Sequence, residues 1–283
     1  MGAAPERVSP RRFIELLAIY AKMDLATLMR DTGFMITCIV SDLCANASAI
    51  SGIFLLAWKF GGIGGLDKFE VLFMLAYCNI VVGSLDSMGG CNALYVSRII
   101  GRGQWEHMFI MPLPFGVQLT VGAFPFTSSS KLVTGIILMC VAVANLSAAL
   151  PWWWGFALAA NLALSMSIMI GVSFLASSLA FYAPVQCEEI SSAVVYSASY
   201  TATFPLSGMP LYLRAPLLSI FPAGLIAWFP TMLILGKTPA LANIYALAFT
   251  AVLALAASHT FKKGFRYYMV KGINRYVSGG HRC

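Results

Sequence analysis

The sequence predicts an all-α, polytopic membrane protein with six transmembrane helices. Of its 283 residues, 59% are hydrophobic and 10% are charged, whereas a soluble domain carries about 25% charged residues. No Asp, Glu, Lys, Arg or His occurs in residues 132–187 or in residues 215–236. A helix crosses the hydrocarbon core in about 20 residues, so the first run is long enough for two crossings and the second for one.

Six apolar segments are expected to cross the membrane, at residues 34–58, 70–96, 132–150, 155–182, 213–235 and 240–259. Basic residues concentrate before the first segment, after the second and after the last, while the opposite loops offer only Lys59, Lys68 and Lys237. The positive-inside rule therefore puts both termini in the cytoplasm. This distribution ties the net charge of +7 to membrane topology, so no nucleic-acid partner is expected.

Residues 1–33 are expected to form a cytoplasmic amphipathic helix. Apolar side chains recur there at helical intervals with charged residues between them, at Phe13, Leu16, Leu17, Tyr20 and Leu28. Such a helix lies in the inner membrane interface or packs on its own bundle, and the two placements are compatible. The segment lacks the short apolar core of a removable signal peptide. Residues 34–259 then make the six-helix domain, and residues 260–283 a basic cytoplasmic tail.

The common motifs of catalysis and nucleotide binding are missing from the sequence. It contains no GxxxxGK[ST] phosphate-binding loop, no HExxH, no GxSxG and no Cys/His cluster. We therefore expect the chain to bind no cofactor or metal of its own. Any energy for its work is expected to come from another subunit.

A polar segment, GRGQWEHMFIMPLPFG at residues 101–116, interrupts the apolar sequence on the predicted cytoplasmic side. Pro112 and Pro114 end its helix-compatible part. A short helix there would present Trp105, Met108, Phe109 and Ile110 to a partner as an apolar knob with a polar rim. The alternative is an ordinary intracellular loop.

Two acidic residues, Asp42 and Asp86, fall inside predicted membrane helices. An ionisable group at that depth is costly and is a functional candidate by default. They lie about 13 Å and about 18 Å from the inner ends of their predicted helices, at 1.5 Å per residue, so one cavity can hold both. The alternative is that nearby polar groups satisfy each carboxylate, for which Ser41, Asn46, Ser84 and Ser87 are available.

Prolines and small residues mark two further segments. Pro222 and Pro230 remove two backbone donors from the predicted fifth crossing, so a kinked or broken helix is expected, either as an outer gate or as a plain structural kink. Residues 191–204, SSAVVYSASYTATF, are small and rich in hydroxyl groups. We expect them to serve close helix packing first and substrate lining second.

The order of these features resembles the permease subunits of type-two ATP-binding-cassette (ABC) exporters. The resemblance rests on the turn at Gly103, Gln104 and Trp105 that runs into Phe109–Pro112, and on FPLSGMPLYLRAPLLSIFPAGLIAWFPTMLILG at 204–236. The ending FKKGFRYYMVKGINRYVSGG is similar to the family's closing segment. The resemblance covers nearly the whole chain.

The resemblance implies a division of labour between subunits. The 101–116 segment would be a coupling helix that docks in a groove of an ATPase subunit through Gly103, Trp105, Glu106, Met108, Phe109 and Pro112. Two ATPase subunits would hold ATP and Mg, and a second permease, identical or paralogous, would complete the complex in the lipid of the bacterial inner membrane. The chain would export a substrate and would have no catalytic residues.

Two other functions remain open at this point. One is a membrane-embedded enzyme that modifies lipid, with Asp42 and Asp86 as its acid and base. The other is an ion channel, although the sequence has no filter-like repeat. The missing catalytic motifs and the proline-ended cytoplasmic segment favour the permease over both.

Overall fold

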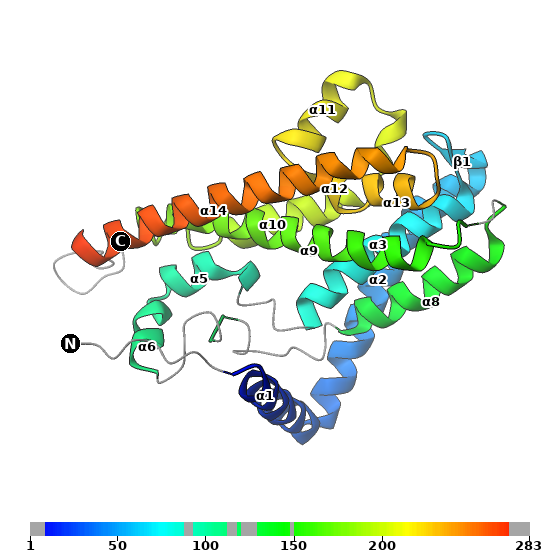
Figure 1. Ribbon diagram of the computed structural model, residues 1–283. Coiled ribbons are helices and arrows are strands. Elements are labelled where there is room, and N and C mark those ends of the chain that lie inside the picture. Colours follow the sequence, from blue (N-terminus) through cyan, green and yellow to red (C-terminus); the bar gives the residue numbers. More distant parts are fainter. Residues whose placement is uncertain (1–8, 88–92, 112–117, 120–128, 148–149, 272–283) are drawn as a thin grey trace.

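The computed structural model describes residues 9–87, 93–111, 118–119, 129–147 and 150–271 (Figure 1). These residues are mostly helical, as the sequence predicts. They also contain a short antiparallel hairpin, β1 (Gly62–Ile63) and β2 (Leu66–Asp67). Helical structure satisfies backbone groups within each segment, which a chain in hydrocarbon requires.

The N-terminal region forms two successive helices with one residue between them. α1 spans Pro10–Arg30, and the Ser9 side chain caps it by accepting a hydrogen bond from the Arg12 amide. Asp31 ends α1, and its carboxylate accepts from the Phe34 amide at the start of α2 (Thr32–Phe60). The predicted helix within residues 1–33 is therefore present, and its position in the membrane interface stays a prediction.

The hairpin joins α2 to α3 (Lys68–Ser87) and is fixed to a distant segment. The Glu70 carboxylate accepts from the Asp67 amide at 2.7 Å. Lys237 pairs with the same carboxylate and donates to the Gly65 carbonyl at 2.9 Å. These contacts attach the α2–α3 connection to the end of the molecule where α14 begins.

α3 is the central helix of the core. Every residue from Val71 to Cys78 is buried. Its main neighbour is α8 (Ser129–Asn145), and α9 (Trp154–Ser177) also contacts it. Glycines permit the close approach of α3 and α8, because a Cβ on Gly83 would lie 2.3 Å from the Leu132 amide nitrogen and one on Gly135 would lie 2.9 Å from that of Ile80.

The second half of the chain packs along α9. After α9, a 3₁₀ turn, η2 (Ser178–Phe181), leads to α10 (Ile190–Ala202). The last helix, α14 (Asn243–Lys271), runs beside α9 and η2, as the green and orange ribbons of Figure 1 show. Short helices follow α3: α5 (Val96–Gly101) and α6 (Gln104–Ile110), and both lie near the far end of α14.

Four of the described helical segments are long and apolar enough to cross a membrane: α2, α3, α9 with η2, and α14 with the preceding 3₁₀ turn η4 (Ala240–Ala242). They correspond to predicted crossings one, two, four and six. α8, at the third, is apolar but has 17 residues. The described part of α3 runs to Ser87 and includes Asp86.

The segment predicted as the fifth crossing, residues 213–235, is broken, which confirms the break expected from its prolines. After a 3₁₀ turn, η3 (Leu206–Gly208), the chain forms three short helices: α11 (Leu211–Ser219), α12 (Ala223–Ile226) and α13 (Trp228–Ile234). Pro222 lies at the break between α11 and α12, where it has no amide hydrogen to continue a helix. Pro230 lies in the first turn of α13, a position that tolerates proline. Their part in a gate stays a prediction.

α14 also departs from the predicted boundary at 259. It continues without a break to Lys271, so the first part of the predicted tail, residues 260–271, is helical, while its cytoplasmic position stays a prediction. Its 29 residues span about 43 Å at 1.5 Å per residue, more than the hydrocarbon thickness of about 30 Å. The end of α14 can therefore extend beyond the membrane and meet α6.

The glycine contacts of α3 give a test of this packing. Gly83→Ala should lower stability by about 1–3 kcal/mol, because its new methyl group meets backbone atoms of α8 that cannot rotate away. Gly52→Ala is the matched control on α2, where a Cβ meets nothing within 4 Å. Thermal unfolding of both purified variants in detergent measures the difference. Equal melting temperatures would contradict the close α3–α8 contact.

Candidate functional site

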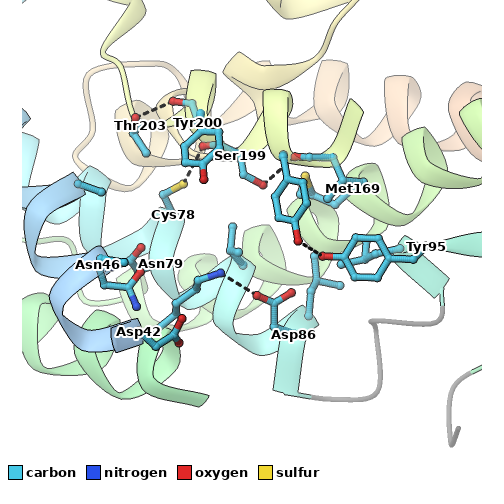
Figure 2. A pocket seen from close by; sticks show the side chains of 18 residues that line it. Asp42, Asn46, Cys78, Asn79, Asp86, Tyr95, Met169, Ser199, Tyr200 and Thr203 are labelled. Atoms are coloured by element: carbon cyan, nitrogen blue, oxygen red, sulfur yellow. Dashed lines mark hydrogen bonds and ion pairs between the residues drawn. The ribbon is translucent and has the colours of Figure 1, made fainter. Parts of the chain in front are cut away.

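A cavity of about 220 Å³ lies among α2, α3, α8, α9 and α10 (Figure 2). Both acidic residues predicted from the sequence, Asp42 and Asp86, line it. The wall also includes Lys131 of α8, Met169 of α9 and Tyr196 of α10. The structure thus brings the two carboxylates to one space, while their contact with a substrate stays a prediction.

Asp86 is held by an ion pair between α3 and α8. Its side chain is buried, and its Oδ2 accepts from the Lys131 ammonium at 3.0 Å. Lys131 lies in the first turn of α8, where the partial positive charge of the helix N-terminus also favours an anion. No sequence motif marks Lys131 as a partner of Asp86, since it stands at the edge of the uncharged run 132–187.

Asp42 is held by the residue next to Lys131. The Ser130 hydroxyl donates to Asp42 Oδ2 at 2.5 Å, and the Asn46 side-chain amide donates to Ser130 Oγ at 3.5 Å. Of the four nearby polar residues predicted to satisfy the carboxylates, Asn46 reaches this contact through Ser130, whereas Ser87 donates to the Gly83 carbonyl of its own helix. Two successive residues of α8 therefore bring together carboxylates from two other helices.

The wall opposite α8 carries hydroxyl groups from α10. Tyr95, just before α5, donates its hydroxyl to the Tyr196 hydroxyl at 3.0 Å. Figure 2 shows Tyr95 among the side chains that line the cavity. Ser199, Tyr200 and Thr203 line the cavity as well. We expect the segment 191–204 mainly to pack against other helices. One of its faces also lines the cavity.

The predicted coupling segment forms a second site at the end of α14. Gly103 joins α5 to α6 with a φ of 77°, a left-handed conformation in which a side chain is strained. Trp105 follows in α6 and is only 1% exposed. Its ring packs against Phe181, Phe261 and Phe265, with ring centroids 5.5–6.1 Å apart. The prediction that Trp105 forms an exposed knob is therefore wrong, because its own chain covers it.

Other predicted coupling residues divide between internal contacts and the surface. The Glu106 carboxylate accepts from the Tyr268 hydroxyl at 2.8 Å, so it binds α14 in addition to bordering solvent. Met108 is half-buried, whereas Ile110 and Met111 are 79% and 51% exposed. The side chain of Phe109, and Pro112 as a whole, lie outside the described residues.

Ionic contacts fasten α5 to the turn before α10. The Arg98 guanidinium donates to both oxygens of Glu189, at 2.8 and 2.5 Å, and Arg102 Nε donates to Glu188 at 3.0 Å. The hydrogen bond from Arg98 lowers the pKa of Glu189 to about 2, and the same bond raises the pKa of Arg98. We call Arg98, Arg102, Glu188 and Glu189 the α5–α10 ion-pair network.

Close packing reinforces this network. The hydroxyl groups of Ser97 and Ser191 lie 2.6 Å apart, and each also accepts from the other residue's amide. A Cβ on Gly101 would lie 2.8 Å from the Pro184 carbonyl oxygen. α5 is therefore tied to the start of α10 by ionic, hydroxyl and backbone contacts together.

A family model described as "ABC-2 family transporter protein" matches residues 43–272. The chain belongs to this family. It is a multi-pass membrane protein and a permease subunit of an ABC transporter, which works with ABC ATPase subunits. No match was found among curated proteins or solved structures. The match confirms the resemblance that the sequence motifs indicate.

The ABC-2 permease has functional contacts that its sequence motifs do not reveal. Phe261, Phe265 and Tyr268 follow each other on one face of α14, yet they were assigned to a tail because they lie past the apolar run. Their spacing of three or four residues is the pattern of a buried helix face and was the available clue. The sequence around Glu188 and Glu189 does not predict their ion pairs, because the arginine partners lie 86 and 91 residues earlier in the chain.

Burial of Trp105 predicts a role in the stability of the ABC-2 permease itself. Trp105→Ala should destabilise the isolated subunit by about 3–5 kcal/mol through the cavity it leaves. Ile110→Ala should change stability by less than about 0.5 kcal/mol, because that side chain is exposed. Unfolding of the permease without its ATPase measures both. Similar stability of the two variants would mean that the aromatic cluster does not form.

The Arg98–Glu189 contact predicts a dependence of stability on pH. Glu189 has a folded-state pKa below its ordinary value of 4.5. Its contribution is therefore fully present above about pH 4.5 and is lost as the pH falls toward about 2. The difference in melting temperature between the parent and Glu189→Gln should shrink over that interval. Glu15→Gln, which removes an exposed pair within α1, is the control and should change little at any pH. A constant Glu189→Gln effect would contradict the assignment.

Proposed function

We propose that this ABC-2 permease exports its substrate across the bacterial inner membrane, driven by ATP hydrolysis in two ABC ATPase subunits. A second permease, identical or paralogous, completes the translocation path, and both termini lie in the cytoplasm. The observation that carries the proposal is the connection between α6 and the cavity wall. ATP and Mg belong to the ATPase subunits, and no residue of this chain is catalytic.

The surface for ATPase docking is the exposed part of α6 rather than Trp105. Ile110 and Met111 offer apolar area, and the exposed side chains of Gln104 and His107 surround it with polar groups. An apolar centre with a polar rim is the usual anatomy of a protein interface. Trp105 supports this surface from behind by fixing α6 on α14.

Contacts of α6 with α14 and α5 connect α6 mechanically to the cavity wall. α6 is bound to α14 through the Glu106–Tyr268 hydrogen bond and the Trp105 ring contacts. It continues through Gly103 into α5, and the α5–α10 ion-pair network ties α5 to α10. Tyr196 and Tyr200 of α10 line the cavity. A displacement of α6 by the ATPase therefore moves a cavity wall, which is what alternating access requires.

Copurification with the ATPase tests the docking surface. The double variant Ile110→Ala/Met111→Ala should weaken capture of a co-expressed ABC ATPase by about tenfold or more, because it removes the apolar anchors. Met269→Ala/Val270→Ala is the matched control, since both side chains are exposed near the end of α14 but lie off α6. Size exclusion establishes that each variant remains folded.

Two results would overturn the proposal. If the α6 double variant retains the ATPase as well as the control does, α6 is not the docking element. If the purified permease hydrolyses ATP without any ATPase subunit, the division of labour between the subunits is wrong.

A further inference from the structure

The cavity has more negative than positive charge. Asp42 and Asp86 supply two carboxylates, and Lys131 supplies one ammonium group among the described lining residues. The undescribed segments between α3 and α8, residues 88–92, 112–117 and 120–128, contain no Asp, Glu, Lys, Arg or His. Nothing in those segments can therefore cancel the surplus carboxylate, which lies in a space bordered by apolar helices.

The two carboxylates differ in their partners. Asp86 already forms an ion pair with Lys131. Asp42 accepts from the neutral hydroxyl of Ser130, which satisfies a lone pair without neutralising its charge. Asp42 is half-buried, and it shares the one ammonium group of Lys131 with Asp86, which holds that group in the ion pair. The two carboxylates together therefore keep a net negative charge that favours a cation. Asp42 is thus the stronger attraction for an incoming positive group.

The rest of the wall suits an apolar body attached to such a group. Val82, Leu85 and Met169 present hydrocarbon and sulfur to the cavity. Tyr196 and Tyr200 add aromatic rings, whose faces attract cations. Figure 2 shows Met169 and Tyr200 on the same side of the cavity, across from the carboxylate of Asp42. A fully hydrated ion would leave these surfaces unused.

We propose that this cavity binds small organic cations, with the cationic centre at Asp42 and the apolar body against Leu85, Met169 and the tyrosines of α10. A metal ion fits less well, because the described residues contain no group of three His, Cys, Asp or Glu side chains able to hold one. That the bound cation is the exported substrate rests on the proposed function.

Lys131 sets the strength of this binding. Its ammonium group neutralises Asp86 and lies among the same carboxylates that attract the ligand. The ligand and Lys131 therefore repel each other, and removal of the lysine charge should strengthen cation binding. A purely structural role for Lys131 predicts the opposite, since loss of the α3–α8 ion pair would only loosen the cavity.

Calorimetric titration of the full-length permease in detergent tests the proposal without transport or ATPase. Benzyltrimethylammonium is the cationic probe, and benzenesulfonate is an anion of similar size. The parent should bind the cation and not the anion. Asp42→Asn should weaken cation binding by about tenfold or more, and Asp42→Glu should retain most of it. Lys131→Gln should tighten binding, and Glu15→Gln on the exposed face of α1 is the control.

The outcomes separate this inference from the transport function. Absence of cation binding to the parent, equal binding of the anion, or full binding in folded Asp42→Asn would overturn the inference. Weaker binding in Lys131→Gln would also count against it. None of these results bears on ATPase capture by α6, so the permease could still export a cargo of another chemical class.

Discussion

Carboxylates among apolar helices need partners, and the first turn of α8 supplies partners for two of them. Ser130 holds Asp42 from α2, and Lys131 holds Asp86 from α3. These contacts meet where α3 and α8 approach closely at Gly83. The surrounding side chains cannot replace them, because an apolar group neither donates to nor neutralises a carboxylate. The position of α8 therefore sets both the core packing and the charge of the cavity.

The end of the molecule that contains α6 is held together by other interactions. Its second cluster is built on aromatic rings around Trp105, with the α5–α10 ion-pair network beside it. The aromatic rings form a rigid core. The arginines and glutamates remain partly exposed, so their ion pairs orient α5 relative to α10 but add little stability. In the proposed mechanism this combination lets α6 move as a unit with the helices that it contacts.

The sequence predicts a feature of this structure well when the residues involved lie close together along the chain. Long apolar runs identify α2, α3, α9 and α14, because membrane crossing is a property of one continuous segment. At 213–235 the apolar composition alone suggests one crossing, and Pro222, which cannot donate a backbone hydrogen bond, predicts the break that the structure has. The position of Trp105 could not be read locally, since its ring partners lie in η2 and α14. Asp42 and Asp86 can be identified from the sequence because acidic residues are rare in apolar segments. Their partners Ser130 and Lys131 can be identified only once the packing of α8 is known.

The aromatic contacts of Trp105 also constrain the order in which the protein can be completed. The ribosome delivers Trp105 early, whereas Phe261 and Phe265 are among the last residues of the described chain. During synthesis the indole therefore lacks these two ring contacts until α14 has been inserted. A nascent or truncated chain that lacks α14 therefore has an α6 without its aromatic support. If the ATPase docks on α6 as proposed, assembly favours chains in which α14 is already in place.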